Sequence, residues 1–392
     1  MIVVSAKRLF TPLETIDDPL LFIDDGIISA ISSRAQRAIP NNATLVDLQN
    51  SILAPGFLDI HLHGGAGIDV MRSAPSELPR LNRFLTKHGV TAYFPTTVAA
   101  PLDQTCQALS RLAEAIELSG NGALKNDLSK DNLQAKPVGI HLEGPFLSHK
   151  RRGVHPPEYL LEPTVKTFDH LCHAARGHVR MMTIAPELPG ALEVIAEAAR
   201  RNVLVSIGHS DAQLEAAQAA VQAGARHATH TFNAMRPLDH RDPGILAEVL
   251  AEAQLSADII ADGIHVAPEV VKLFLQAKGL ERSVLITDAT AATGMPDGVY
   301  QLGPIQVEVK DGTCTMQGKL AGSVLTMDRA IRNAMAFAGW SLQDSLRAAT
   351  LNPARAAGLT NHGKLAPGVA ADFVVLGPEG EVRNTIVRGR GL

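Results

Sequence analysis

The sequence predicts an α/β protein: a (β/α)8 TIM-type barrel with a small β-sandwich domain formed by the N- and C-terminal segments. Strand-like apolar runs alternate with helical runs at intervals of roughly thirty residues, and eight such units close a barrel. The two ends instead carry short strands with too few apolar residues for separate cores, so we expect them to combine. We expect residues 57–344 to form the barrel domain and residues 1–56 plus 345–392 the discontinuous sandwich.

Composition and charge narrow the class of protein. Hydrophobic residues make up 46% of the chain and charged residues 19%, which is typical of a soluble globular protein. The formal net charge of −4 offers no basic face for nucleic acid. No apolar run reaches the ~18 residues that cross a membrane, and the first residues do not follow a signal-peptide pattern. We therefore expect a cytoplasmic protein with no membrane partner.

The three cysteines predict neither disulfides nor a cysteine metal site. Cys106, Cys172 and Cys314 are odd in number, widely separated and without CxxC spacing. Buried thiols are the expected outcome.

The two ends of the chain have the pattern of short antiparallel strands. The first 56 residues contain the runs MIVVSAKRLF, PLLFIDDGIISAI and TLVDLQNSILAPG, and Asp25-Gly26 is a turn signal. Residues 363–392 are again short strand-like runs separated by Gly and Pro. This similarity favours one small β domain built from both ends.

Strand and helix candidates alternate between the two ends. The eight strand candidates are Phe57–His63, Gly89–Val98, Val138–Pro145, Val179–Ala185, Val203–His209, His227–Asn233, Leu255–Ala261 and Val284–Asp288. Helices are expected at 102–118, 191–201, 268–278 and 323–338. The polar segment 119–136 is typical of an exposed insertion, and we assign it no chemistry.

Capping signals mark the ends of two predicted helices. Ser210 and Gln213 have capping-box spacing, and Gly224 is placed to end the helix that follows them. Ser323 is the expected N-cap of the last helix, which should end at Gly339.

Residues 202–234 predict a strand–helix–strand unit that brings two histidines together. The uncharged, β-branched run Val203–Ile207 is typical of a strand buried on both faces. A helical crossover makes the two strands parallel, with their carboxyl ends at one rim. His209 and His230 stand near those ends, so we expect them to converge.

Other strand ends supply side chains of the same chemical kind. His61 and His63 are two apart on one strand and should point the same way. The remaining candidates at this rim are His141, Glu143, Asp262, His265 and Asp288. Imidazoles and carboxylates bind zinc and related divalent ions, and a cation would offset the cost, on the order of several kcal/mol, of burying an unpaired Glu143. The alternative is a hydrogen-bonded polar network without metal.

These residues stand in motifs that resemble a known family. The motifs are PGFLDIHLH, HLEGPF, GHS, THTFNAM, ADGIHV, TDAT and the C-terminal ATLNPARAAGLTNHGKLAPGVAADFVVL. Together they resemble the amidohydrolase superfamily and, within it, the N-acetylglucosamine-6-phosphate deacetylase family. HLEGPF and THxxNAM are specific to the deacetylase branch, whereas the first and last motifs occur across the superfamily. The resemblance runs over the whole chain and implies a metal-dependent hydrolase acting on a linear amide.

The resemblance implies which residues hold metal. Glu143, His209 and His230 match ligands shared by the deacetylases. His61 and His63 match a second position, completed by Glu143 and Asp288, that some members keep and others replace. One or two divalent ions are therefore implied, with zinc expected and iron, cobalt or manganese as alternatives. The lysine that many amidohydrolases carboxylate is absent from the fourth strand here, and Glu143 takes its place.

Asp288 matches the general acid/base of the family. A metal ion lowers the pKa of a bound water from about 15.7 to roughly 7. Asp288 would take a proton from that water and return it to the leaving amine, a transfer that contributes on the order of 10²–10⁴-fold. An N-cap role is the alternative, because TDAT is also a cap-like sequence.

Family positions that contact substrate also have counterparts here. They are Val154, His155, Asn233, Ala234, Arg241, Asp262, His265, Leu320, Ala321 and Gly322. Arg241 matches the phosphate-binding arginine, whose guanidinium suits two phosphate oxygens at once. In relatives this arginine can reach the neighbouring subunit's site, which would imply a homodimer. Ordinary loop roles for His155 and His265, and a solvent-exposed role for Arg241, are the alternatives.

The implied substrate is a small amino-sugar phosphate. The implied reaction converts N-acetyl-D-glucosamine 6-phosphate to D-glucosamine 6-phosphate and acetate, in amino-sugar catabolism or cell-wall recycling. The N-acetylgalactosamine 6-phosphate epimer is a close alternative. A cyclic-amide hydrolase or dipeptidase is more remote, because Arg241 and the NAM motif argue against both. Retention of every ligand position argues against a non-catalytic binding barrel.

Overall fold

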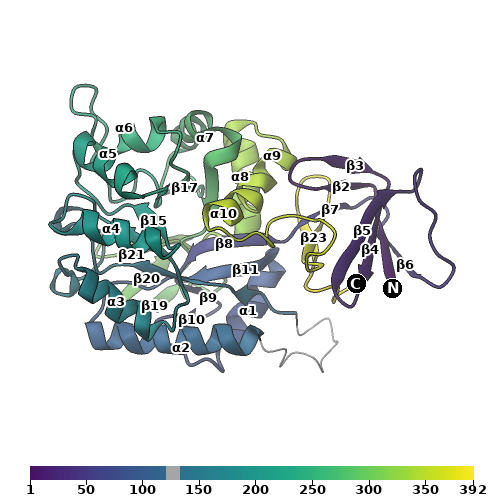
Figure 1. Ribbon diagram of the computed structural model, residues 1–392, viewed down its shortest axis with the longest axis horizontal. Coiled ribbons are helices and arrows are strands. Elements are labelled where there is room, and N and C mark those ends of the chain that lie inside the picture. Colours follow the sequence, from purple (N-terminus) through teal and green to yellow (C-terminus); the bar gives the residue numbers. More distant parts are fainter. Residues whose placement is uncertain (121–132) are drawn as a thin grey trace.

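The computed structural model describes residues 1–120 and 133–392, which form a mixed α/β structure. Figure 1 shows a region of strands and helices beside a smaller region of sheets in which the N- and C-termini lie. The predicted α/β class is confirmed. Part of the predicted insertion 119–136 lies outside the described residues. Its first two residues, 119 and 120, belong to helix α2 (Leu102–Gly120).

The ends of the chain build two sheets, the first from N-terminal strands alone and the second from strands of both ends. The first has the order β5-β4-β1-β6 and the second β24-β23-β7-β2-β3. Their strands are β1 (Ile2–Ser5), β2 (Arg8–Phe10), β3 (Thr15–Asp17), β4 (Pro19–Asp24), β5 (Ile27–Ser33), β6 (Thr44–Asp47), β7 (Ile52–Pro55), β23 (Phe373–Leu376) and β24 (Val382–Ile386). Leu21, Leu53, Phe373 and Ile386 share one buried apolar cluster. The N- and C-terminal strands therefore combine around a common core.

Eight strands of the larger region lead to the candidate site described in the next section. In chain order they are β8 (Phe57–Leu62), β11 (Val90–Pro95), β13 (Ile140–Glu143), β14 (Val179–Ile184), β15 (Leu204–Ile207), β16 (His227–Ala228), β17 (Ala257–Ile260) and β18 (Ser283–Ile286). Parallel ladders join β8 to β11, β13 through β14 and β15 to β16, and β17 to β18. A short strand, β12 (Lys136–Pro137), also pairs with β11.

Backbone hydrogen bonds link these groups of strands to one another. Thr97 N donates to His141 O at 3.0 Å between β11 and β13, and Ala228 N donates to Ser256 O at 3.0 Å between β16 and β17. Asp288 N donates to His61 O at 2.9 Å, which links the end of β18 back to β8. Each strand thus contacts the next in the order of the chain, and the last contacts the first.

Helices pack around these strands (Figure 1). They are α1 (Leu78–Lys87), α2 (Leu102–Gly120), α3 (Val165–Ala174), α4 (Ala191–Arg200), α5 (Leu214–Ala223), α6 (Gly244–Ala251), α7 (Pro268–Arg282), α8 (Met327–Ala338), α9 (Leu342–Ala348) and α10 (Leu351–Ala356). Two short 3-10 helices, η2 (His149–Arg151) and η3 (Pro157–Tyr159), follow β13. Among the helices of the described residues, none combines the length and the apolar character that a membrane span requires.

Two predicted helix starts are wrong. Ser210 Oγ donates to Glu187 Oε2 at 2.7 Å instead of capping a helix, and α5 begins only after Gln213. Ser323 Oγ donates to the carbonyl oxygen of Thr287 at 2.6 Å, and α8 begins four residues later. In both places the hydroxyl binds a distant group that the sequence pattern does not reveal. The helices end at the predicted glycines, Gly224 and Gly339.

A four-stranded antiparallel sheet lies between β18 and α8, where the sequence analysis assigned no structure. Its strands are β19 (Gly298–Leu302), β20 (Ile305–Lys310), β21 (Thr313–Met316) and β22 (Lys319–Leu320). The alternation of apolar and polar residues in IQVEVK, followed by Asp311-Gly312, is the sequence signal for its central hairpin. Both ends of this sheet reach the site described next.

Candidate metal centre and active site

The six predicted ligand residues converge at the carboxyl ends of five strands. His61 lies on β8 and His63 directly follows it, Glu143 ends β13, and His209, His230 and Asp288 follow β15, β16 and β18. All six are buried, none with more than 7% of its surface exposed. Side chains more than two hundred positions apart in sequence therefore share one small volume.

Glu143 and two histidines form the first part of this cluster. Glu143 Oε1 lies 3.0 Å from His230 Nε2 and 3.2 Å from His209 Nε2. The two Nε2 atoms are themselves 3.0 Å apart. Three ligand-type atoms facing one another at these distances can bind a common cation.

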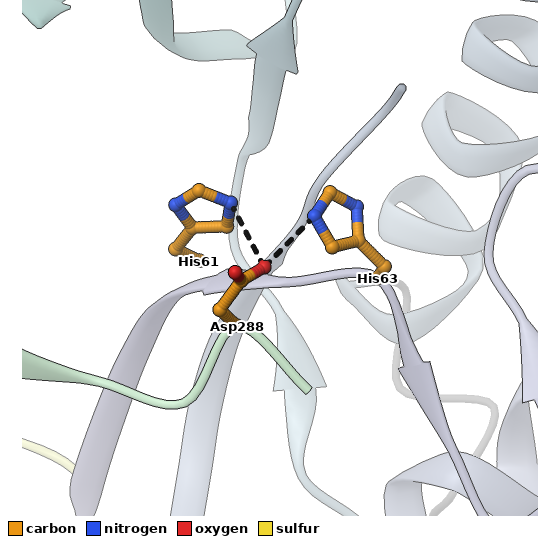
Figure 2. A group of neighbouring side chains, drawn as sticks. All are labelled: His61, His63 and Asp288. Carbon is orange, nitrogen blue, oxygen red and sulfur yellow. Dashed lines mark ion pairs between the residues drawn. The ribbon is translucent and has the colours of Figure 1, made fainter. Parts of the chain in front are cut away.

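His61, His63 and Asp288 form the second part. Figure 2 shows both imidazoles facing the same carboxylate oxygen, at 3.5 Å from His61 Nε2 and 3.1 Å from His63 Nε2. One ligand atom from each of the three residues lies within 4.8 Å of the others. Glu143 joins the two parts, because its Oε2 lies 3.3 Å from His63 Nε2 and its Oε1 lies 3.5 Å from His61 Nε2.

Backbone carbonyls fix the orientation of two of these rings. His63 Nδ1 donates to Thr96 O at 3.0 Å, and His209 Nδ1 donates to Arg151 O at 2.9 Å. A carbonyl only accepts, so each Nδ1 carries a proton, and each ring in its neutral form presents an Nε2 lone pair to the cluster. This second contact is the usual support of a metal-binding histidine.

The donor set and its unpaired nitrogen fit one or two divalent cations. His61 Nε2, the ring nitrogen that faces Glu143 and Asp288, is buried without a hydrogen-bond partner among the described residues. Buried polar groups are normally satisfied, so such an atom indicates a missing partner. Four imidazoles and two carboxylates are ligands that zinc, iron, cobalt and manganese accept.

The electrostatics of the cluster also favour a cation. Burial raises the pKa of Glu143, but the imidazoles, led by His61, outweigh it and hold that pKa well below its ordinary value. Burial lowers the pKa of His63 and of His230, but the nearby carboxylates outweigh it and raise the two values to about 10 and about 9. The cluster therefore stabilises positive charge, which a bound cation would supply while leaving the rings neutral.

Three ligand-type residues have left-handed backbone angles. The φ values are 47° at His209, 28° at His230 and 50° at Asp288. Such angles are uncommon for residues other than glycine and cost on the order of 1–3 kcal/mol each. The chain thus turns sharply at these strand ends, and the turns aim the side chains into the cluster.

His141 lies beneath the cluster and does not face its ligand atoms. Its Nδ1 contacts Thr96 Oγ1 at 3.2 Å and its Nε2 contacts Thr183 Oγ1 at 2.8 Å. Burial lowers its pKa well below the ordinary value, so the ring is neutral. The expectation that His141 stands with the ligands is wrong, because both of its nitrogens are already hydrogen-bonded in the interior.

Sequence reasoning missed a buried pair that supports His230. Asp258 on β17 accepts a hydrogen bond from the backbone N–H of His230 through Oδ1. Its Oδ2 lies 3.0 Å from His227 Nε2, and both side chains are fully buried. The sequence signal for this pair is Asp258 itself, an acidic residue inside the apolar run Ala-Asp-Ile-Ile of β17, because a buried carboxylate needs a partner.

A cavity of about 240 Å³ opens above the cluster. Of the predicted substrate-contacting residues, those that line it are Val154, His155, Asn233, Ala234, His265, Leu320, Ala321 and Gly322. Lining residues that the sequence analysis did not name include Val98, Ile260, Leu302, Pro304 and Ile305. Among the described residues that line it, none is a lysine or an arginine.

His155 is placed as a neutral hydrogen-bond donor. Its Nδ1 accepts from Ala99 N at 3.1 Å, so the ring proton is on Nε2, which lies 3.7 Å from Glu143 Oε2. Burial lowers the pKa of His155 to about 3, which keeps the ring uncharged. An Nε2–H group beside the cluster can donate to a substrate oxygen.

Asp262 orients the ring of His265. Asp262 Oδ2 accepts from His265 Nδ1 at 2.7 Å, and its Oδ1 accepts from the backbone N–H of His265 at 2.8 Å. Burial raises the pKa of Asp262, but His265 outweighs it and lowers the value below the ordinary one. His265 lines the cavity and Asp262 stands behind it.

Arg241 lies on an exposed loop and is absent from the described residues that line the cavity. Its backbone N–H donates to Asp239 Oδ1 at 2.8 Å. The site of one chain therefore does not contain this predicted phosphate ligand.

Comparisons with known proteins agree with this geometry. Residues 52–392 match the profile of the Amidohydrolase family. The chain is 37% identical over 390 residues to the N-acetylgalactosamine-6-phosphate deacetylase of Escherichia coli O157:H7, covering 99% of this chain and 98% of that protein. It is 35% identical to the N-acetylglucosamine-6-phosphate deacetylase of Bacillus subtilis (strain 168), covering 99% and 96%.

A solved structure shows the same likeness in three dimensions. It is a mutant N-acetyl-D-glucosamine-6-phosphate deacetylase from Mycobacterium smegmatis in complex with N-acetyl-D-glucosamine-6-phosphate. It superposes with a TM-score of 0.90 at 35% sequence identity, covering 99% of this chain and 98% of that chain. The chain therefore belongs to the amidohydrolase family.

Proposed function

We propose that this protein hydrolyses the acetamide of N-acetyl-D-glucosamine 6-phosphate, giving D-glucosamine 6-phosphate and acetate. The observation that carries the proposal is the buried cluster of four histidines and two carboxylates at the floor of a cavity lined by eight of the predicted substrate-contacting residues. Curated N-acetylglucosamine-6-phosphate deacetylases that are 34% to 38% identical to the chain support it.

We assign the first cation position to Glu143, His209 and His230. His61, His63 and Asp288, with Glu143 shared, would hold a second. We propose zinc as the ion, because imidazole and carboxylate are its common ligands. A divalent cation bound here supplies Lewis acidity and a water nucleophile at neutral pH.

The chain's own residues divide the proton transfers. Burial raises the pKa of Asp288, but His61 and the other imidazoles outweigh it and keep the value below the ordinary one, so its carboxylate is an acceptor. Asp288 takes one proton from the attacking water as the new C–O bond forms. It returns that proton to the amide nitrogen as the C–N bond breaks, which releases the amine and acetate.

His155 and the cavity residues bind and orient the substrate. The Nε2–H of His155 faces the cluster and donates to the carbonyl oxygen, where negative charge develops. Asn233 Nδ2 donates to His230 O at 3.3 Å, which leaves its Oδ1 free to accept from the sugar. His265, held by Asp262, lines the same cavity.

The galactosamine epimer is the second candidate substrate. The N-acetylgalactosamine-6-phosphate deacetylase of Escherichia coli O157:H7 is as similar to this chain as the curated glucosamine enzymes are, at 37% identity. A change at one hydroxyl is distinguished by few hydrogen bonds, so sequence identity of this size does not separate the two.

We also propose the architecture that the function uses. The pairing of each strand with the next, and of β18 with β8, supports a (β/α)8 barrel spanning residues 57–344. The shared apolar cluster of the two terminal sheets supports a β-sandwich domain of residues 1–56 and 345–392. We propose a cytoplasmic homodimer in which Arg241 binds the phosphate in the neighbouring subunit's cavity, because its exposed position leaves it outside its own.

Acetate release from both epimeric sugar phosphates tests the proposal. The purified protein should be assayed after metal analysis, and again after chelation and separate addition of zinc, iron, cobalt and manganese. We expect hydrolysis of at least one epimer, loss of activity on chelation, and recovery with the natural ion. Absence of acetate release from both epimers with every ion would overturn the proposed function.

A further inference from the structure

The turn between β19 and β20 forms one side of the cavity. Leu302, Pro304 and Ile305 of this turn line it together with Val98, which follows β11. Val98 and Leu302 are buried in one apolar cluster, and Ile305 packs against it. We call Val98, Leu302 and Ile305 the apolar wall.

Asp69 holds this wall in place. The carboxylate of Asp69, only 5% exposed, accepts from Gly303 N at 2.6 Å through Oδ2 and from Met71 N at 2.7 Å through Oδ1. Asp69 ends β10 (Ile68–Asp69), six residues after His63. The loop that follows the metal-binding strand is thus tied to the backbone of the turn.

Gly303 allows the turn to lie directly against Val98. Its φ is 54°, and a Cβ atom at this position would lie 2.3 Å from Val98 Cγ2. A side chain at residue 303 would therefore displace Val98 or the turn. The turn is therefore packed against Val98 at the same residue whose backbone N–H Asp69 binds.

Val98, at one end of the apolar wall, lies across the cluster from Asn233, whose Oδ1 accepts from the sugar in the proposed function, and from its neighbour Ala234. Val98 follows β11, and Asn233 and Ala234 follow β16; in the order in which the eight strands contact one another, these strands are four places apart. An amide places its acyl group and its amine on opposite sides of the carbonyl carbon. A sugar on the β16 side therefore directs its acyl group toward the apolar wall.

We propose that Val98, Leu302 and Ile305 form the acyl-binding surface and limit the acyl group to acetyl, and that Asp69 is a positioning residue for this surface. The inference rests on the proposed function, because it assigns the acyl end of that substrate. Its reason is chemical: the methyl group is the apolar part of the substrate, and the wall is apolar and held by the backbone. One additional methylene against a fixed wall costs on the order of 10–200-fold in kcat/KM.

The test compares N-acetyl-, N-propionyl- and N-butyryl-glucosamine 6-phosphate as substrates. We expect Val98→Ala to raise the kcat/KM of the propionyl relative to the acetyl substrate by about tenfold. Val307→Ala is the matched control, because Val307 belongs to the same apolar cluster but is not among the residues that line the cavity. Ile305→Ala, at a half-buried position, gives the same test if the first variant does not fold.

Asp69→Asn tests the positioning role. An asparagine side chain presents one N–H₂ group to two backbone donors, so one of the two hydrogen bonds is lost. We expect the propionyl-to-acetyl ratio to rise in this variant with its metal content unchanged. Asp297→Asn is the control, because Asp297 Oδ2 accepts from Asp311 N at 3.1 Å beside the same sheet but at an exposed position.

The outcomes separate this inference from the proposed function. An active wild-type enzyme with an unchanged acyl ratio in Val98→Ala and Ile305→Ala overturns the inference alone. An equal rise in Val307→Ala overturns it too, because general loosening then explains the change. If only the galactosamine epimer is hydrolysed, its three acyl derivatives replace the glucosamine series. A wild-type enzyme that cleaves the acyl derivatives of neither epimer overturns the proposed function and this inference with it.

Discussion

His63 Nε2 lies 3.1 Å from Asp288 Oδ1, so residues at the ends of β8 and β18 meet at a single carboxylate oxygen. This contact joins the first and last of the eight strands at the site itself. Asp288, the proposed acid/base, thus lies next to two imidazoles, those of His61 and His63, that would bind a cation. Mutations of Asp288 and of the histidines can therefore test proton transfer and cation binding separately.

Asp288→Asn should remove proton transfer while keeping the fold. The amide cannot accept the proton of the attacking water, although it can still hydrogen-bond to His63. We expect kcat to fall by about 10²–10⁴-fold with little change in Tm. Steady-state kinetics, thermal melting and metal analysis of the same preparation check this. Undiminished hydrolysis with full metal content would remove Asp288 from the role.

The two parts of the cluster should differ in importance. We expect His209→Ala or His230→Ala to abolish activity and metal binding at the first position, because Glu143 Oε1 faces both of these rings at close range. The double variant His61→Gln with His63→Asn should keep measurable activity and one metal ion. Metal content per chain and acetate release are the measurements, and equal loss in all variants would show that the second position is indispensable.

Mixed dimers test whether Arg241 acts in the neighbouring subunit. Arg241→Ala should raise KM by about 10–100-fold, because it removes a charge-assisted contact to the phosphate. Co-expression of Arg241→Ala with Asp288→Asn chains should restore roughly a quarter of wild-type activity, since half of randomly paired dimers would hold one complete site. Mixed samples no more active than the parents would argue against the shared site.

Asp328 should contribute stability that is lost in acid. Burial raises its pKa, but hydrogen bonds led by that from His88 outweigh it and lower the value to about 2 from 3.8. His88 Nδ1 lies 3.0 Å from Asp328 Oδ1 and ties the end of α1 to α8. The folded protein thus binds this proton less tightly than the unfolded chain, and the contribution is complete above pH 3.8 and disappears as the pH falls toward 2.

The expected size of this contribution is at most about 2 kcal/mol. Asp328→Asn should lower the free energy of unfolding at pH 7 and flatten its decline between pH 4 and pH 2. Denaturant titrations at several pH values measure both effects. Asp103→Asn, at an exposed position in the first turn of α2, is the control, and an equally flattened acid decline in that variant would contradict the assignment.

The sequence predicted strands at uninterrupted apolar runs. Where the backbone turns, the predicted strands are longer than the observed ones. The predicted strand His227–Asn233 is only two residues long in the structure, because the chain turns at His230 and Phe232, both with positive φ. Periodicity reports which residues are apolar and cannot report a left-handed angle at a histidine. His230 nevertheless lies beside Glu143 and His209, because its place depends on the strand's end and not on its length.

The contacts that orient the site could not be predicted. His63 depends on the carbonyl of Thr96, His209 on that of Arg151, and the β19–β20 turn on Asp69. Each of these bonds uses a backbone atom far away in sequence, and a backbone atom leaves no residue-type signal. The residue types at the strand ends indicated the cluster, whereas the hydrogen bonds that orient its side chains appear only once the chain is folded.

The sheet β19–β22 occupies a single connection, between β18 and α8, yet both of its ends border the cavity. Evolution can therefore exchange or reshape this one continuous stretch without touching the histidines that face the cluster. A recombination event confined to it would change which molecules the enzyme accepts while its catalytic chemistry is inherited intact.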